Sequence, residues 1–203
     1  METKITDSSS KAFYDAYAED YFEQTVRTEM DEAYKRFLCH LSPSSSIVDL
    51  GSGSGRDLAY FTQHGFVATG VDESERLCAL ARAYSGCRVL CCSFQSWIPH
   101  EKYAGIWANA SLLHLTPEEL VCFWRRVPNA LVENGVIFFS MKKGITTGND
   151  NLGRYFTNFD ERLAKIMFEA TPNLQVIDYW ESDDKMQRND FKWVNYICRK
   201  IRR

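Results

Sequence analysis

Short apolar runs alternate with amphipathic stretches through the middle of the chain. Stretches with apolar residues three and four positions apart predict helices at 54–64 and 74–84, and a Thr-Pro pair at Thr116 is typical of the start of a third helix. The apolar runs predict strands at 47–50, 66–71, 88–92, 103–109 and 135–141. Repeated strand–helix units of this kind predict a parallel sheet with helices on both faces.

Other patterns flank this region. Helices are predicted at 11–24 and 29–41, and the first of them places four aromatic residues, Phe13, Tyr14, Tyr17 and Tyr21, on one face. Asn134-Gly135 predicts a turn before the strand at 135–141.

The last third of the chain predicts a different arrangement. Residues 142–153 are rich in turn formers and predict a loop, and a helix is expected at 160–169. Strands at 174–181 and 190–198 flank a polar segment and predict a hairpin. We therefore expect an α/β, Rossmann-like, doubly wound and mostly parallel seven-stranded sheet that ends in an antiparallel C-terminal hairpin strand.

Composition narrows the class of protein. With 203 residues, 45% of them hydrophobic and 25% charged, the chain is typical of one soluble globular domain. Its longest apolar runs are too short to span a bilayer, and the first residues lack the apolar core of a secretory signal, so we expect a cytoplasmic protein. The net charge of −3 does not favour a nucleic-acid partner. The seven cysteines lack metal-binding spacing, so we expect free thiols and no metal.

Candidate chemistry gathers in the segment Ile47–Arg56, where a strand runs into a loop with three glycines. Such a loop can bring backbone N–H groups and a helix N-terminus close to a polar ligand. A nucleoside triphosphate would require Lys-Ser or Lys-Thr after the glycines, and a dinucleotide would require glycine where the chain has Arg56. Asp49 would repel a pyrophosphate but attract the ammonium group of S-adenosylmethionine. Asp72, after the next strand, can accept two ribose hydroxyls and indicates a nucleoside.

Four motifs in register, VDLGSGSGR, TGVDES, YAGIWANASLLHL and LVENGVIFFS, resemble those of class I S-adenosylmethionine-dependent methyltransferases, and within that class the small bacterial stand-alone enzymes. The resemblance covers roughly residues 45–141. It implies one methyltransferase domain over 1–203. Residues 1–42 would form a helical lid, 45–141 the cofactor-binding core, and 142–203 a substrate-side loop, helix and closing hairpin.

The resemblance also implies roles for matching positions. The glycine loop and Asp49 would hold the methionine end, Asp72 and Glu73 the ribose, and Ser93 and Phe94 the adenine, with Asn109 and Ala110 beneath the sulfonium. The expected cofactor-binding residues are Asp49, Gly51, Ser52, Gly53, Gly55, Arg56, Asp72, Glu73, Ser93, Phe94, Asn109 and Ala110.

The methyl acceptor is the open question of the sequence. The candidate catalytic residues are His114 and Tyr14, and the candidate substrate-binding residues are Tyr17, Tyr21, Arg154 and Tyr155. Because the cofactor carries an activated methyl group, alignment of donor and acceptor can provide most of the catalysis. A small-molecule acceptor is expected. A tRNA or protein acceptor, a non-catalytic S-adenosylmethionine-binding subunit and an NAD-dependent oxidoreductase are the alternatives. The oligomeric state is left open.

Overall fold

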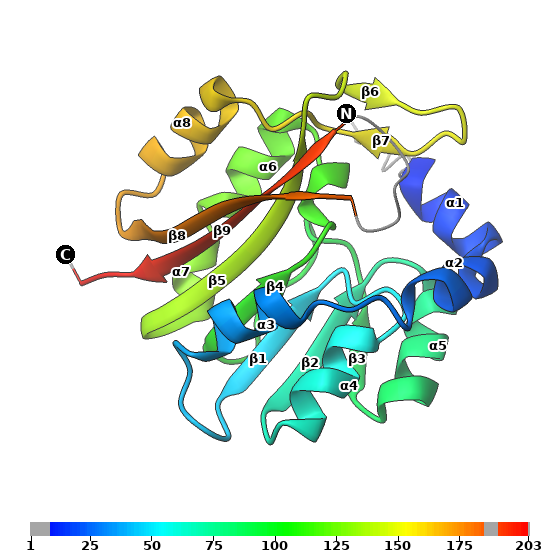
Figure 1. Cartoon of the computed structure of the whole chain (residues 1–203), viewed down its shortest axis with the longest axis horizontal. Coiled ribbons are helices and arrows are strands. Elements are labelled where there is room, and N and C mark those ends of the chain that lie inside the picture. Colours follow the sequence, from blue (N-terminus) through cyan, green and yellow to red (C-terminus); the bar gives the residue numbers. More distant parts are fainter. Residues whose placement is uncertain (1–8, 185–190, 203) are drawn as a thin grey trace, which may run out of the picture.

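A seven-stranded sheet runs through the computed structural model, which describes residues 9–184 and 191–202 (Figure 1). In spatial order the strands are β3 (Arg88–Cys91), β2 (Val67–Asp72), β1 (Ser46–Leu50), β4 (Tyr103–Ala108), β5 (Leu131–Lys143), β9 (Lys192–Lys200) and β8 (Leu174–Asp183). β9 is antiparallel to both of its neighbours, and the pairs among the first five strands are parallel. The expected fold class is confirmed.

Helices cover both faces of the sheet. One face carries α3 (Asp31–Leu38), α4 (Arg56–Gln63) and α5 (Glu75–Ser85). The other carries α6 (Pro117–Trp124), α7 (Val127–Ala130) and α8 (Glu161–Glu169). The helices α1 (Ser9–Ala16) and α2 (Ala18–Thr25) pack against α5, and a short 3-10 helix, η1 (Leu112–His114), follows β4.

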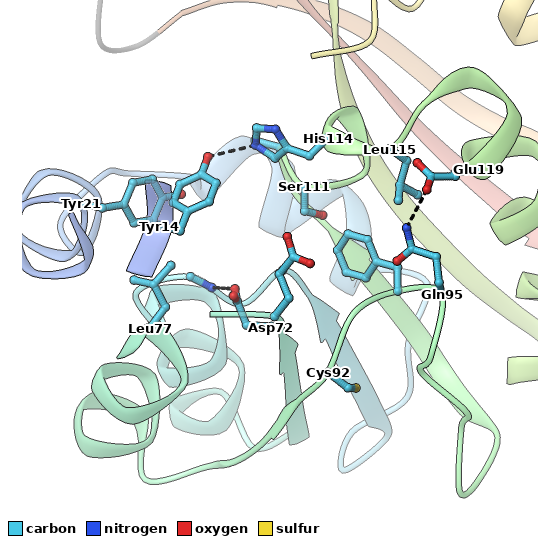
Figure 2. Close-up of a pocket in the computed structure, with 15 residues that line it drawn as sticks. Tyr14, Tyr21, Asp72, Leu77, Cys92, Gln95, Ser111, His114, Leu115 and Glu119 are labelled. Atoms are coloured by element: carbon cyan, nitrogen blue, oxygen red, sulfur yellow. Dashed lines mark hydrogen bonds between the residues drawn. The ribbon is translucent and has the colours of Figure 1, made fainter. Parts of the chain in front are cut away.

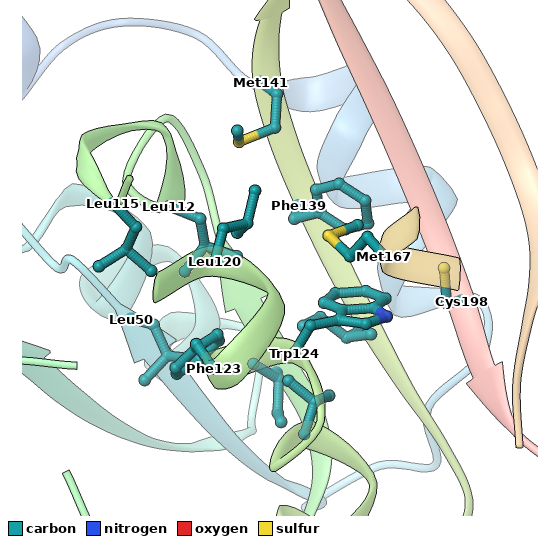
Figure 3. Packing of buried hydrophobic residues seen from close by; sticks show 14 of the residues in the cluster. Leu50, Leu112, Leu115, Leu120, Phe123, Trp124, Phe139, Met141, Met167 and Cys198 are labelled. Carbon is teal, nitrogen blue, oxygen red and sulfur yellow. The ribbon is translucent and has the colours of Figure 1, made fainter. Parts of the chain in front are cut away.

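Strand alternation explains the two cores. Ile47 of β1 packs beneath α3 and α4, whereas its neighbours Val48 and Leu50 belong to the larger core on the other face. That core joins α6 and α8 to the sheet through fully buried side chains such as Trp124 and Phe139 (Figure 3). Each such residue contributes about 1.5–3 kcal/mol by leaving water. Burial on both faces is why the strands read as continuous apolar runs.

The predicted helix at 11–24 is interrupted. Tyr17, with φ −117° and ψ 29°, separates α1 from α2, and both short helices reach α5. The interruption also separates the aromatic residues, since Tyr14 and Tyr21 face a cavity while Tyr17 is 50% exposed and contacts Phe13. A single face of four aromatic residues was therefore a wrong prediction.

Two predicted irregular segments turn out to be partly strand. Asn134-Gly135 forms a wide bulge within β5, where the pairing register moves from Tyr103–Leu131 to Gly105–Val136 and Asn134 takes a φ of +62°. The expected loop at 142–153 starts with the end of β5 and contains one arm of a small hairpin, β6 (Gly148–Asn149) with β7 (Tyr155–Phe156). Residue 190, the predicted start of the last strand, lies outside the described residues.

The predicted start of the helix after β4 is confirmed. Thr116 accepts a hydrogen bond from the backbone N–H of Glu119, and the Glu119 carboxylate accepts one from the N–H of Thr116. Across residues 9–184 and 191–202, no helix combines the length and the apolar character that a membrane crossing requires.

Candidate functional site

Two cavities open at the carboxyl ends of the central strands, beneath α1 and α2. The first contains about 720 Å³ of space and the second about 880 Å³. They share Tyr21, Gly51, Gly53 and Ala110, so they are two arms of one site on either side of the Tyr21 ring. An elongated ligand can pass over the glycine loop from one arm to the other.

The first cavity joins the glycine loop to η1 and to the loop after β3 (Figure 2). Gln95 donates a hydrogen bond to Glu119 across its rim. Its lining residues are Tyr14, Tyr21, Gly51, Gly53, Asp72, Glu73, Leu77, Cys92, Phe94, Gln95, Ala110, Ser111, His114, Leu115 and Glu119.

The second cavity extends from the glycine loop to the ends of β8 and β9. Its lining residues are Tyr21, Thr25, Thr28, Met30, Gly51, Ser52, Gly53, Ser54, Arg56, Asp57, Asn109, Ala110, Ser140, Ser182, Asp183, Asp184, Trp193 and Asn195.

The N–H groups of the glycine loop are directed inward. Those of Gly51 and Ser52 donate to the carbonyl of Val71 at 2.7 and 3.1 Å, and that of Gly53 donates to the Asp72 carboxylate at 2.9 Å. Gly55 N–H donates to Ser52 O. The expectation that these groups close on a ligand is therefore wrong for all four. Those four N–H groups are therefore not available to a phosphate.

Glycine is required in this loop for two reasons. Gly51 has a φ of +79°, and a Cβ added to it would lie 2.3 Å from the Cβ of Ser111. Gly55 has a φ of +77°, and its added Cβ would lie 2.8 Å from the Cα of Ala81 in α5. The loop is thus shaped by close approach to η1 and α5 as well as by its left-handed backbone.

Asp72 connects the loop to the next helix. Its carboxylate accepts from the N–H groups of Gly53 at 2.9 Å and Ser74 at 3.0 Å while lining the first cavity. Burial raises the pKa of Asp72 to about 6, although the two hydrogen bonds act to lower it. Lone pairs remain on both oxygens, so the group can still accept hydrogen bonds from two hydroxyls. Glu73 lines the same cavity.

Asp49 lies beneath the loop. Only 1% of it is exposed, it lines neither cavity, and its Oδ2 atom finds no hydrogen-bond partner among the described residues. The hydroxyls of Ser52 and Ser111 are buried without a partner in the same part of the chain. Burial, with Asp57 nearby, raises the pKa of Asp49 well above its usual range. The loop therefore has unpaired buried oxygens around it.

Arg56 and Asp57 form a buried pair at the start of α4. Arg56 Nε and Nη2 donate to the two Asp57 oxygens at 2.6 and 2.9 Å, and Asp57 also accepts from Tyr34 at 2.5 Å and Trp107 at 2.7 Å. Burial opposes the charge on Asp57, but Arg56 and these donors lower its pKa overall. Arg56 lines the second cavity with its guanidinium already engaged, so its predicted cofactor contact is not formed by a free cation.

A hydrogen-bonded pair borders the first cavity at its other end. The Tyr14 hydroxyl lies 2.9 Å from His114 Nε2 (Figure 2). His114 Nδ1 lies 2.7 Å from the carbonyl oxygen of Tyr155. Burial lowers the pKa of His114 to about 4. Both candidate catalytic residues are therefore brought together at the cavity.

Other predicted residues lie elsewhere. Ser93 is hydrogen-bonded to Ser96 and lines neither cavity, whereas its neighbours Cys92 and Phe94 line the first. Tyr17 lies outside both cavities. Arg154 pairs with Asp150 at 2.7 Å and lines a separate hollow. Tyr155 contributes its backbone carbonyl, to His114.

The loop after β4 is fixed from β5. Ala110, with a φ of +52°, donates its N–H to the Ser140 hydroxyl at 2.7 Å, and Ser140 donates to the Asn109 side chain at 2.9 Å. Asn109 and Ala110 line the second cavity as predicted for the cofactor site. Ser140 was missed, although a serine that ends an apolar strand is a usable signal. Asp184 and Trp193 had no such signal because only the sheet brings them here.

Metal binding has no support in the described residues, where no group of three or more His, Cys, Asp or Glu side chains is placed to hold a metal ion. Their cysteines are all free.

Comparison with known proteins agrees with this geometry. Residues 47–135 match the family described as a methyltransferase domain. No curated protein sequence matches the chain.

Solved structures share the fold. The 1,6-didemethyltoxoflavin-N1-methyltransferase of Burkholderia thailandensis, solved with 1,6-didemethyltoxoflavin and S-adenosylhomocysteine bound, is 20% identical, with a TM-score of 0.76 over 100% of this chain and 94% of that one. Magnesium protoporphyrin IX methyltransferase from Synechocystis PCC 6803, with S-adenosylmethionine bound, is 10% identical, with a TM-score of 0.73 over 98% and 100%. The CcbJ methyltransferase of Streptomyces caelestis is 15% identical, with a TM-score of 0.73 over 97% and 100%.

Proposed function

We propose residue roles and an acceptor class for this chain, which belongs to the class I S-adenosylmethionine-dependent methyltransferases. The observation that carries the proposal is the polarity of the glycine loop. The N–H groups of Gly51, Ser52, Gly53 and Gly55 are paired within the protein, while the carboxyls of Asp49 and Asp72 stand beneath and beside the loop. Such a loop suits a ligand that brings cationic and hydroxyl groups, as S-adenosylmethionine does.

The adenosine half belongs in the first cavity. Asp72 and Glu73 would accept the ribose hydroxyls, and Phe94 with Leu77 and Cys92 would enclose the adenine. Ser93 would lie at the edge of the adenine site, because it shares a loop with Phe94.

The methionine half belongs over the loop, toward the second cavity. Gly51, Ser52, Gly53 and Asn109 would enclose it, and Gly55 would support the loop through its close approach to Ala81. Asp49 would offset its ammonium charge from below, and Arg56 would shape the wall through its pair with Asp57. When bound, S-adenosylmethionine supplies an activated methyl group. The protein positions the acceptor and excludes water.

The acceptor is proposed to be a small molecule that reaches the site beneath α1 and α2. Tyr21 borders both cavities, so the acceptor would meet the cofactor beside this ring. Arg154 lies over the ring of Phe13 at 4.6 Å, so Arg154 and Tyr155 would close the site by holding α1. The small-molecule acceptors named for the toxoflavin and protoporphyrin enzymes support this class.

Calorimetry with S-adenosylmethionine and S-adenosylhomocysteine tests the cofactor assignment. We expect both ligands to bind the wild-type protein, Asp49→Asn to abolish binding of S-adenosylmethionine, and Asp72→Asn to weaken both ligands. Asp20→Asn, an exposed position in α2, is the matched control and should bind like the wild type. A wild-type protein that binds neither ligand would refute the proposal.

Transfer of a labelled methyl group tests the acceptor. Protein and S-adenosylmethionine are incubated with metabolite, RNA and protein fractions of the source cell, and label is expected in the metabolite fraction. Label in tRNA or protein would replace the small-molecule acceptor. Cofactor binding without any transfer would indicate a non-catalytic subunit. A cytoplasmic location stays part of the proposal.

A further inference from the structure

A chain of hydrogen bonds leads from the first cavity to a backbone carbonyl. The carbonyl oxygen of Tyr155 can only accept, so His114 Nδ1, at 2.7 Å, must carry a proton. In the neutral imidazole Nε2 then has a lone pair, and the Tyr14 hydroxyl, at 2.9 Å, donates to it. The Tyr14 oxygen also accepts a hydrogen bond from Arg154, which leaves it one lone pair, and Tyr14 lines the cavity. The geometry thus fixes both the tautomer and the direction of the Tyr14 proton.

The surroundings keep His114 neutral. It is largely buried, and two cations, Arg154 and Lys142, oppose a positive charge on the ring, while Asp150 favours one. Together these effects lower the pKa of His114 to about 4. At neutral pH the Nε2 lone pair is therefore unprotonated, and because the ring is a weak base it passes on a proton that it receives and does not keep it.

Tyr14 faces charges of both signs. Burial raises its pKa, Tyr21 and Asp72 add to that effect, and Arg154 opposes it. The phenol stays protonated in the empty protein. Arg154, which donates a hydrogen bond to the Tyr14 oxygen, would stabilise negative charge that develops there during the reaction. The pair is therefore arranged to pass a proton on and not to hold an anion.

We propose that Tyr14 and His114 form a proton relay, which makes the preferred acceptor a neutral hydroxyl or N–H group that loses its proton on methylation. The proposal rests on the proposed function and deepens it. The acceptor atom forms a bond to the methyl carbon, and the pair of electrons from the broken C–S bond stays on sulfur. The acceptor proton moves to the Tyr14 oxygen, and the Tyr14 proton moves to His114 Nε2. The imidazolium then returns its proton to water.

Other acceptor classes do not use this arrangement. A thiolate, a halide or a tertiary amine has no proton to lose, so a relay would not assist its methylation. A histidine with a purely structural role needs a hydrogen bond to one of its ring nitrogens. It does not need a tyrosine hydroxyl that borders a cavity at its other nitrogen. Both Tyr14 and His114 line the first cavity, and this favours a relay over a purely structural role.

Nitrogen-15 NMR of the histidine rings tests the relay without turnover. In the S-adenosylhomocysteine complex we expect His114 to be neutral, with its proton on Nδ1, from pH 7.5 down to about pH 5. Tyr14→Phe should shift the Nε2 resonance and leave the tautomer unchanged. A proton on Nε2 of the neutral ring would overturn the relay, because Tyr14 would then have no acceptor for its proton.

Kinetics with the labelled metabolite fraction tests the role. We expect Tyr14→Phe and His114→Asn to reduce kcat at least tenfold while the Kd for S-adenosylhomocysteine stays within threefold, which separates this failure from loss of the cofactor site. Tyr84→Phe and His64→Asn change an exposed phenol and an exposed imidazole outside both cavities and should match the wild type. Label on an oxygen or nitrogen that carried hydrogen supports the proposal. Label on sulfur, a halide or a tertiary amine, or no product at all, overturns it.

Discussion

Replacing Asp72 with asparagine should stabilise the empty protein at neutral pH. In the folded chain the Asp72 pKa is raised from 3.8 to about 6, mainly because the carboxyl is buried. A proton therefore binds the folded state more tightly than the unfolded one. As pH rises from 3.8 to about 6 the wild type loses stability, and above that range the loss is complete. Asparagine does not ionise and does not lose stability in this way.

The magnitude follows from the two pKa values. Ionisation of Asp72 lowers the free energy of unfolding by about 1.6 kcal/mol at pH 5 and about 3 kcal/mol at pH 7.5. Asparagine also disturbs the hydrogen bonds from Gly53 and Ser74, but by a similar amount at both pH values. The advantage of Asp72→Asn over the wild type should thus grow by about 1.4 kcal/mol between the two pH values.

Urea unfolding of both proteins at pH 5 and pH 7.5 measures this difference directly, because other titrating groups cancel in the comparison. Asp20→Asn, with its exposed side chain, should show no such dependence on pH. An equal effect of Asp72→Asn at both pH values would refute the reasoning. It would mean that the two backbone donors fully offset the burial. If Asp72→Asn is more stable than the wild type but binds S-adenosylmethionine and S-adenosylhomocysteine more weakly, the binding site lowers the stability of the empty protein.

Three further changes test the loop and its supports. Gly51→Ala should lower the free energy of unfolding in urea by well over 2 kcal/mol, because left-handed strain of about 1–2 kcal/mol adds to the overlap with Ser111, which precedes η1. Gly65→Ala, with φ +82° and open space around the added Cβ, should cost the strain alone. Asp57→Asn should cost about 3–5 kcal/mol by leaving Arg56 buried without its partner, and a loss under 1 kcal/mol would contradict that pairing. Thr116→Ala should lower stability by about 1 kcal/mol, and an unchanged urea midpoint would mean that the capping box contributes nothing.

The fold was predictable because its signals are local. Each central strand is buried on both faces and therefore appears as an apolar run, and caps such as Thr116 mark helix starts within four residues. The break at Tyr17 was not predictable, because the aromatic spacing fits one helix as well as two. The bulge at Asn134-Gly135 has the sequence of a turn, and only pairing with β4 keeps it in a strand.

Residues of the site were predictable only where they belong to one of the sequence motifs. Gly51, Gly53, Asp72 and Asn109 come from motifs with fixed spacing, and they line the cavities, whereas Gly55 and Asp49 line neither. Arg56 looked available for a ligand because Tyr34 and Trp107, which hold its partner Asp57 in place, come from distant parts of the chain. No local pattern reports that a charge is already paired. The far wall of the second cavity, from β8 and β9, was missed for the same reason.

Burial moves the charges of this site toward neutrality from both directions. It raises the pKa of Asp49 and Asp72 and lowers that of His114, so in each case the uncharged form is favoured. A site of this kind has low charge until a cation arrives. A ligand with positive groups over Asp49 and beside Asp72 would favour their ionised forms, so its binding would release protons and strengthen as pH rises through about 6. His114, at the opposite end, would stay neutral over that range. The same desolvation thus prepares one end of the site for a cationic donor and the other for an acceptor that gives up a proton.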